Sequence, residues 1–251
     1  MKALITGASS GIGYSMAKYL SSLGYDLILV ARDKEKLQEI QKELKTDVKI
    51  VVADLSQESK LKELYVLCKN DNIDILINNA GFGLFGEFDS TELQTELEMI
   101  DVNIRAVHIL TKLFLKDMVK RDSGYILNVS SSASFQAGPL MSTYYATKSY
   151  VTKLSVAIYE ELRRKKSNVH ISCLCPGPVK TNFNNVADVK FAIKGLDSDY
   201  VARYAIDKML NKNKLIIVPG FKMKLALFFN KFISIKRGAK IVYKIQKRKR
   251  K

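Results

Sequence analysis

The chain has 251 residues, 47% of them hydrophobic, so it is long enough and apolar enough to bury the core of one α/β domain. Its formal net charge of +16 is uneven, because residues 1–207 hold all 25 acidic residues and 26 basic ones, whereas residues 208–251 hold 15 Lys or Arg and no acid. No apolar run in the basic tail reaches the roughly 18 residues of a membrane-spanning helix, which excludes a transmembrane tail.

Short apolar runs alternate with longer amphipathic segments along the chain. In chain order, the strand candidates are residues 2–5, 26–30, 48–52, 73–78, 125–129, 169–174 and 215–218. The helix candidates are residues 11–23, 34–44, 56–69, 91–120 and 144–165. This alternation implies parallel strands joined by right-handed crossovers, and continuous Ile, Leu and Val runs fit strands covered on both faces. We therefore predict a single-domain, doubly wound Rossmann-type sheet of about seven strands over residues 1–220, with a basic helical extension over residues 221–251.

A glycine-rich turn follows the first strand at residues 6–13, TGASSGIG. Gly7 allows a tight turn, Gly11 lets a ligand approach the backbone, and Gly13 lets the first helix pack closely on the strand. Amides at the new helix N-terminus favour a negative group, so the turn can hold a dinucleotide pyrophosphate. Glycines also build ordinary loops, so these eight residues alone leave both interpretations open.

The second strand is followed by Ala31 and Arg32, where an acidic residue would bind the ribose 2′-hydroxyl of NAD. A guanidinium suits a 2′-phosphate instead, so we predict NADP rather than NAD. Asp33 is placed as a helix N-cap. Asp54, after the third strand, is expected to accept the adenine amino group, to cap a helix, or to do both.

Polar residues also follow the fourth and fifth strands. Asn78-Asn79-Ala80-Gly81 ends the fourth, and Ser131 lies just past the fifth. Tyr144 and Lys148 are four residues apart and share one helix face. A lysine ammonium beside a tyrosine lowers its pKa from about 10 and makes it a usable proton donor and acceptor. In isolation the pair is better explained as a half-buried aromatic and a solvated charge.

Taken together, these residues resemble the short-chain dehydrogenase/reductase family over residues 2 to 182. The family motif TGxxxGxG matches residues 6–13, NNAG matches residues 78–81, and YxxxK matches Tyr144 to Lys148. The family serine falls on Ser131, its helix-four asparagine on Asn103, and its PG-x-V-x-T segment on residues 176–181. Six motifs in series make a chance match very improbable.

The resemblance implies hydride transfer between a nicotinamide and a carbonyl carbon, in the direction of reduction. Tyr144 would exchange the proton, Lys148 would lower the pKa of Tyr144 and hold the ribose, Ser131 would polarise the carbonyl, and Asn103 would anchor a water relay. The expected catalytic residues are therefore Asn103, Ser131, Tyr144 and Lys148, with no metal. The expected cofactor-binding residues are Gly7, Ser9, Ser10, Gly11, Ile12, Gly13, Arg32, Asp54, Leu55, Asn79, Ala80, Gly81, Tyr144, Lys148, Pro176, Gly177, Val179 and Thr181.

Substrate choice in this family rests on the loop after the sixth strand, here residues 182–199. Its apolar members indicate an apolar lid for a lipid-like, acyl or steroid-like carbonyl, or else residues that pack on the body; they are Phe183, Val186, Phe191, Ile193 and Leu196.

The tail carries an aromatic and aliphatic stripe at helical spacing: Phe221, Leu225, Phe228, Phe229, Phe232 and Ile235. Basic residues flank it: Lys222, Lys224, Lys231, Lys236, Arg237 and Lys240. A basic helix with an aromatic face is typical of binding to an anionic membrane surface, and we favour this over nucleic acid. The alternative is that the stripe packs on the body or on a second subunit. We expect the last five residues, 247–251, to be disordered when unbound.

The cysteines and the chain start indicate a compartment. Cys68, Cys173 and Cys175 are odd in number, and we expect buried reduced thiols rather than a metal site. A strand candidate that begins at residue 2 leaves no room for a signal peptide, so we expect a cytoplasmic protein, attached at most peripherally to a membrane.

Two functions of different classes remain. The first is an NADPH-dependent reductase of a small carbonyl substrate, acting as a homo-oligomer, a dimer or a tetramer. The second is a dinucleotide-sensing binding protein that uses its basic tail on nucleic acid or a protein partner. The complete set of Ser131, Tyr144 and Lys148 favours the reductase.

Overall fold

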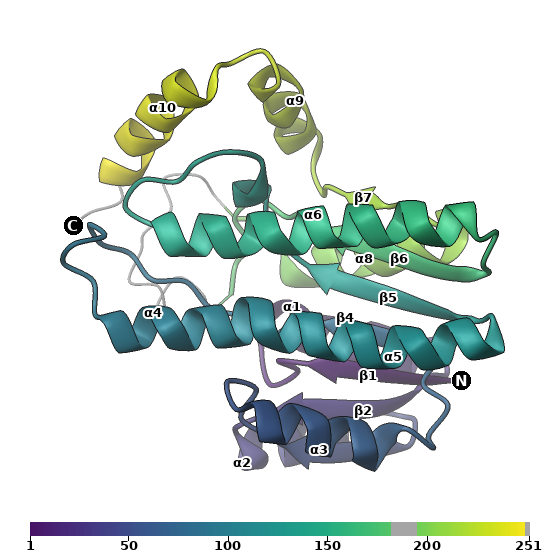
Figure 1. The fold of residues 1–251 in the computed structure, drawn as a ribbon. Coiled ribbons are helices and arrows are strands. Elements are labelled where there is room, and N and C mark those ends of the chain that lie inside the picture. The colour runs from purple at the N-terminus through teal and green to yellow at the C-terminus, as the bar shows by residue number, and fades with distance from the viewer. Residues whose placement is uncertain (182–194, 249–251) are drawn as a thin grey trace.

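A computed structural model describes residues 1–181 and 195–248 (Figure 1). Its centre is one parallel sheet with the strand order β3-β2-β1-β4-β5-β6-β7. In that spatial order, the strands are β3 (Val48–Val52), β2 (Asp26–Ala31), β1 (Lys2–Thr6), β4 (Ile75–Asn78), β5 (Gly124–Val129), β6 (Val169–Leu174) and β7 (Ile216–Ile217). The predicted seven-stranded, doubly wound Rossmann-type sheet is confirmed.

The chain reverses its direction of winding at β1. This strand pairs with β2 on one side and with β4 on the other, for example Ile5 with Leu29 and with Ile77. Loops that leave β1 and β4 therefore diverge at the carboxyl ends of neighbouring strands, which is where doubly wound sheets bind their ligands.

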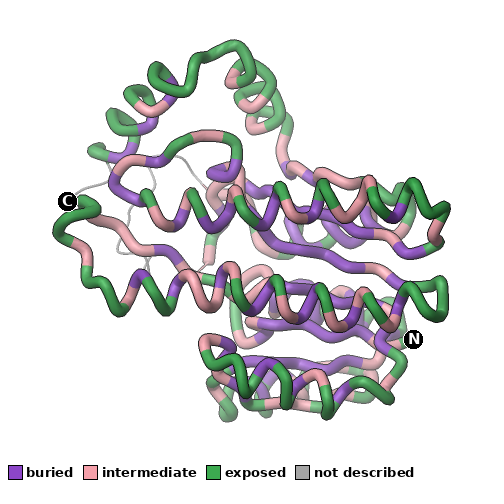
Figure 2. Tube along the Cα trace, in the orientation of Figure 1, coloured by how far each residue is buried: buried purple, intermediate pink, exposed green. Residues whose placement is uncertain are grey.

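Helices cover both faces of the sheet because successive strand residues point to opposite sides. Ala3 and Ile5 pack against α1 (Gly11–Ser22), α2 (Lys34–Glu43) and α8 (Ser198–Lys212). Leu4 packs into the opposite layer, against α3 (Glu58–Cys68), α5 (Val107–Arg121) and α6 (Ser142–Arg164). Figure 2 shows the consequence, an almost continuous buried sheet between helices whose outer faces are exposed.

Helix α8 was not among the predicted helices. It lies within the chain after β6 and packs on α1, where Ser15 Oγ donates to Ser198 Oγ at 3.0 Å and Tyr19 Oη donates to Asp207 at 2.7 Å. Its buried stripe includes Val201, Ala202, Ala205, Ile206 and Met209. The three cysteines are buried thiols without disulfide bonds, as expected.

The predicted helix over residues 91–120 is interrupted in the middle. Helix α4 (Leu93–Ile100) runs into a π-helical segment, η1 (Asp101–Ala106), and then into α5. Wider π-helical turns inside α-helices occur frequently at functional sites, because they re-aim individual side chains. Here the segment carries Asn103, whose side chain is fully buried.

The basic extension forms two helices, α9 (Phe221–Asn230) and α10 (Ile235–Lys247), rather than one continuous stripe. Ser234 ends the break by accepting the backbone amide of Arg237. Figure 1 shows both helices standing away from the sheet, with their connection at the top of the view. Over residues 1–181 and 195–248, the helices fall short of the length and hydrophobicity that a membrane crossing requires.

Candidate active site

The loops after β1 and β4 are fastened to each other. Thr6 Oγ1 accepts the backbone amides of Asn79 and Ala80 at 3.0 and 3.1 Å, and Asn79 Nδ2 donates to the carbonyl oxygens of Thr6 and Gly7, each at 3.0 Å. The sequence had placed Asn79 against the cofactor without assigning it this structural task. Because these bonds cross between two strands, no local sequence pattern could reveal them.

Two glycines of the turn have the roles expected of them. Gly7 adopts φ +63°, and a Cβ added there would lie 2.8 Å from the Ala80 Cα. A Cβ on Gly13 would lie 2.3 Å from the Gly7 carbonyl oxygen. No larger residue fits either position without moving the backbone, so the turn is tight and α1 starts directly against it.

The N-terminus of α1 fits an anionic group. The Ser10 side chain makes no capping hydrogen bond, and the first turn of α1 contains no acidic residue. The amides of this turn therefore remain available to donate hydrogen bonds to a phosphate oxygen, with the helix dipole favouring the negative charge. This is the cradle that a dinucleotide pyrophosphate requires.

The carboxyl ends of β2 and β3 bring Arg32 and Asp54 near each other. Arg32 is exposed. Burial raises the pKa of the Asp54 carboxyl, but hydrogen bonds from the backbone and hydroxyl of Ser56 and the field of Arg32 outweigh it, so the net pKa is lowered. Asp54 thus closes a local turn, while Asp33 caps α2 by accepting the Lys36 amide at 3.0 Å, as predicted. Arg32, the residue for which the sequence predicted a 2′-phosphate partner, directly follows β2.

Asn103 joins three elements around the site. Its Nδ2 donates to the Phe82 carbonyl at 2.9 Å and to Thr147 Oγ1 at 3.1 Å, and its Oδ1 accepts the Phe82 amide at 3.1 Å. Thr147 Oγ1 in turn donates to the Tyr144 carbonyl at 2.7 Å. Thr147 is a site residue that the sequence did not single out, and it connects η1 to the helix that carries Tyr144.

Ser131, Tyr144 and Lys148 converge beyond the end of β5. Ser131 precedes the 3₁₀ turn η2 (Ser132–Phe135) and accepts the Ala133 amide at 3.1 Å, which fixes its side chain. Its hydroxyl forms a hydrogen bond with Tyr144. Lys148 Nζ donates to the Val129 carbonyl at 3.0 Å and lies 5.9 Å from the centroid of the Tyr144 ring. The three side chains predicted to act together are therefore neighbours.

The ionisation of Tyr144 differs from the expectation. Burial raises the pKa of its phenol to about 12, the hydrogen bond with Ser131 opposes this, and the neighbouring Tyr145 adds to it. The prediction that Lys148 lowers this pKa is not met in this structure, because the ammonium donates to Val129 and is itself buried. Burial lowers the pKa of Lys148 to about 8. At neutral pH, Tyr144 is a neutral phenol, which is the proton-donating form.

The segment after β6 contacts both the turn η2 and the glycine turn. The Ser132 amide donates to the Pro176 carbonyl at 2.8 Å, which ties this segment to η2. A Cβ on Gly11 would lie 2.9 Å from the Thr181 Cγ2, so Thr181 reaches the glycine turn. Val179 bridges to Leu196. The other four predicted lid residues, Phe183, Val186, Phe191 and Ile193, lie outside the described residues.

An apolar cluster surrounds the Tyr144 ring. Met99, Ala133 and Met141 are buried against it, and Phe82, Leu84, Phe85 and Tyr145 pack around them half-buried. The aromatic pair Tyr144 and Tyr145 is perpendicular, with ring centroids 6.1 Å apart. Sequence reasoning missed this cluster, because its members come from four separate segments.

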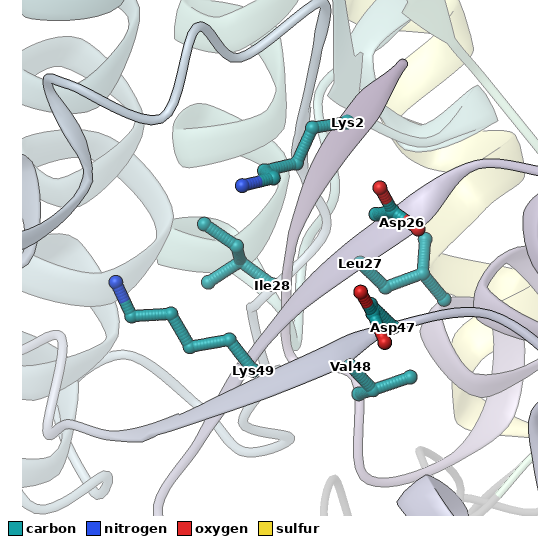
Figure 3. A pocket seen from close by; sticks show the side chains of 7 residues that line it. All are labelled: Lys2, Asp26, Leu27, Ile28, Asp47, Val48 and Lys49. Carbon is teal, nitrogen blue, oxygen red and sulfur yellow. The ribbon is translucent and has the colours of Figure 1, made fainter.

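A hollow lies at the amino ends of β1, β2 and β3, at the other end of these strands from the candidate active site (Figure 3). It measures about 260 Å³, and its lining includes Lys2, Asp26, Asp47 and Lys49. Lys2 and Lys49 both pair with Asp71, at 2.8 and 3.1 Å. These ion pairs lie at the amino ends of the strands, whereas the candidate active site lies at the carboxyl ends.

Comparisons with known proteins agree with this geometry. A family model described as short chain dehydrogenase matches residues 1–190. An uncharacterized oxidoreductase of Staphylococcus epidermidis is 33% identical over 188 residues, which make up 74% of this chain and 81% of that protein.

Two solved structures resemble the whole fold. A short-chain dehydrogenase from Sphingobium yanoikuyae in complex with NADPH has 28% sequence identity and a TM-score of 0.82, covering 92% of this chain and 93% of that one. The bulky-bulky ketone specific alcohol dehydrogenase from Comamonas testosteroni has 28% identity and a TM-score of 0.78, covering 92% of both chains. The protein described here belongs to the short-chain dehydrogenase/reductase family and is an NAD(P)-dependent oxidoreductase.

Proposed function

We propose that the protein is an NADPH-dependent reductase of an apolar ketone or acyl-type carbonyl. The observation that carries the proposal is the placement of the Tyr144 phenol, which is hydrogen-bonded to Ser131 inside an apolar cluster and lies close to Lys148. A neutral, oriented phenol can give a proton to a carbonyl oxygen, whereas a phenolate cannot.

The four polar residues of the site then have separate roles. Ser131 positions the carbonyl oxygen by a hydrogen bond, and Tyr144 donates the proton to that oxygen. Lys148 holds the ribose hydroxyls and supplies positive charge below the phenol. Asn103 keeps the Phe82 backbone and α6 in register, and its family role is to anchor the water that resupplies the proton. When bound, NADPH provides the hydride that this chemistry requires.

NADP is favoured over NAD by the position of Arg32. The glycine turn and the uncapped start of α1 suit either cofactor, but only a 2′-phosphate gives the exposed guanidinium a partner at this place. The related Sphingobium enzyme was solved with NADPH, which supports the same choice.

The apolar substrate is supported by the seven side chains around Tyr144. A sugar in such surroundings would leave buried hydroxyls without partners, which costs roughly 1–3 kcal/mol for each group. The resemblance to an alcohol dehydrogenase described as specific for bulky-bulky ketones points to the same class.

The test is NADPH oxidation, followed by absorbance, across matched carbonyls. Aliphatic and aryl ketones, steroid ketones and 3-oxoacyl thioesters are compared with sugars of similar carbonyl reactivity. We expect turnover with the apolar set and with NADPH in preference to NADH. Turnover confined to the sugars, or binding of NADPH without turnover on any carbonyl, would contradict the proposal; the latter favours a dinucleotide-sensing protein.

The exposed tail supports a second element of function, attachment of residues 221–251 to an anionic membrane surface. All residues of α9 are exposed or half-exposed, with Phe221 at 77%, Phe232 at 76% and Ile235 at 83% of their full accessibility. The exposure of these side chains supports attachment to a membrane over the alternative that the stripe packs on the body of the same chain. Basic residues and exposed aromatics on one element are the combination that binds the interface of anionic bilayers. The buried free thiols fit a cytoplasmic enzyme of this kind.

Co-sedimentation with vesicles tests the attachment. Binding should require anionic lipid and weaken with salt, since each Lys or Arg near the surface contributes about 1 kcal/mol. Replacing Phe221 and Phe232 together by Ala should reduce binding at least about tenfold. Phe88→Ala, which removes a phenyl that is 67% exposed on the body, is the matched control. If the double variant instead dissociates an oligomer and still binds vesicles, the stripe is a subunit interface.

A further inference from the structure

A larger hollow, separate from the one at the amino ends of β1, β2 and β3, opens between the two tail helices and the body. It measures about 590 Å³, within the roughly 300–1,000 Å³ of small-molecule sites. Its walls come from the end of η2, from β7 and the residue that follows it, and from both tail helices. Asn230 Nδ2 holds α9 to the body by donating to the Phe135 carbonyl at 3.0 Å.

The walls of the hollow are mainly apolar. Aromatic and aliphatic side chains line it from every element, namely Phe135, Ala137, Ile216, Val218, Leu227, Phe228, Ile233 and Ile235. Such a lining favours a hydrocarbon ligand, because burying methylene groups against it removes apolar surface from water. The lining therefore suits an apolar chain better than a polar metabolite.

The charged lining residues are all basic. Lys224 and Lys231 line the hollow, and its described lining contains no Asp or Glu. Lys224 Nζ is oriented by donating to the Tyr204 hydroxyl at 2.9 Å. Lys231 follows α9 directly, next to the exposed aromatics. Charge complementarity thus favours an anionic group on the ligand.

The apolar wall is continuous with the exposed surface of the tail. Phe228, Ile233 and Ile235 line the hollow and are also exposed at 53%, 37% and 83%. A hydrocarbon chain can therefore pass from a membrane interface into the hollow without leaving apolar contact. This continuity is what an amphiphile in a bilayer requires.

We propose that this hollow binds one acyl chain of an anionic phospholipid taken from the membrane surface, with the lipid phosphate paired to Lys231. The inference rests on the membrane attachment proposed above and makes it specific: the tail recognises a single lipid in addition to a charged surface. The hollow also adjoins the candidate active site, since η2 follows Ser131 and α9 places Met223 against Gly177, where a Cβ would lie 2.5 Å from the Met223 Cε.

The full-length protein is tested with dioctanoyl phosphatidylglycerol, kept below the concentration at which it forms micelles, by titration calorimetry and native mass spectrometry. Dioctanoyl phosphatidylcholine is the control lipid. We expect one phosphatidylglycerol per chain and binding at least about tenfold weaker for the phosphatidylcholine, because a charge-assisted hydrogen bond is lost.

Two variants test the acyl-chain contact and the phosphate contact separately. Leu227→Asn makes the wall polar, and Lys231→Gln removes the charge; each should weaken phosphatidylglycerol binding by about tenfold or more. Lys222→Gln is the matched control, because Lys222 is exposed on the same helix and does not line the hollow. If Leu227→Asn disturbs folding, seen as a changed melting temperature, Lys231→Gln alone decides the outcome.

Several results would overturn the proposal: no binding of the short-chain lipid, equal binding of both lipids, or variants that bind as the wild type does. A Leu227→Asn effect confined to the KM of a long-chain carbonyl would assign the hollow to the substrate instead. Failure of membrane attachment itself is distinguishable, because it abolishes vesicle sedimentation of the wild type, whereas failure of this proposal leaves sedimentation intact.

Discussion

Replacing Arg32 by Ala should remove the preference of the enzyme for NADPH over NADH. Arg32 follows the last residue of β2, is exposed, and lies close enough to Asp54 for its field to lower the pKa of that carboxyl. The glycine turn and the start of α1, which bind the part common to both cofactors, are untouched by the change. The variant should therefore lose affinity for NADPH and keep its affinity for NADH.

The magnitude follows from the kind of contact that is lost. Hydrogen bonds to a charged group contribute roughly 1.5–3 kcal/mol, and about 1.4 kcal/mol corresponds to a tenfold change in affinity. Because the guanidinium is exposed, we expect the lower part of this range, a weakening of NADPH binding by about 10- to 30-fold. Arg32→Lys keeps the charge but not the two-pronged geometry, so its loss should be smaller.

Calorimetric titration with NADPH and with NADH measures both effects. Lys42→Ala, which removes a cation from the last turn of α2, is the matched control and should bind both cofactors as the wild type does. Equal weakening of both cofactors by Arg32→Ala would refute the assignment, because it would show that Arg32 supports the loop and does not recognise a phosphate.

Two further predictions concern the catalytic residues. Asn103→Ala should lower the free energy of unfolding by about 1–3 kcal/mol for each backbone group of Phe82 that it leaves unpaired, and it should also lower kcat. Urea denaturation measures the stability, and an unchanged free energy of unfolding would contradict the hydrogen bonds described. The kcat of carbonyl reduction should hold at neutral pH and fall as pH rises through about 8, because the Lys148 ammonium loses its proton there while Tyr144, with a pKa of about 12, keeps its own. A pH profile that stays level up to pH ~10 would exclude a protonated Lys148 from the reaction.

Much of the sheet could be predicted because its strands are buried on both faces. Runs such as residues 27–30 and 75–77 are continuously apolar, and helices separate the strands along the chain, so all seven strands were located. Helix α8 was missed because it begins beside the loop segment and carries charged residues along much of its length. The break between α9 and α10 was missed because the apolar spacing continues across it.

The catalytic residues of the site could be predicted from residue type and spacing. The contacts between residues far apart in the sequence could not. Ser131, Tyr144 and Lys148 could be named because their spacing places them beyond one strand and on one helix face. The bonds of Thr6 and Thr147 could not be foreseen, since their partners are 73 and 44 residues away in the chain. The pKa of Tyr144 depends on the depth of its burial, which the sequence does not state.

The central claim is that Tyr144 gives the proton in an NADPH-dependent reduction, and its most direct test is Tyr144→Phe. Turnover and NADPH affinity are measured on the same preparation, with Tyr145→Phe as control, since that neighbouring hydroxyl accepts a hydrogen bond from Gln246 in the tail. Tyr144→Phe should lower kcat by on the order of 10²–10⁴ while leaving NADPH binding nearly unchanged, and Tyr145→Phe should remain active. Turnover of Tyr144→Phe near that of the wild type would contradict the account.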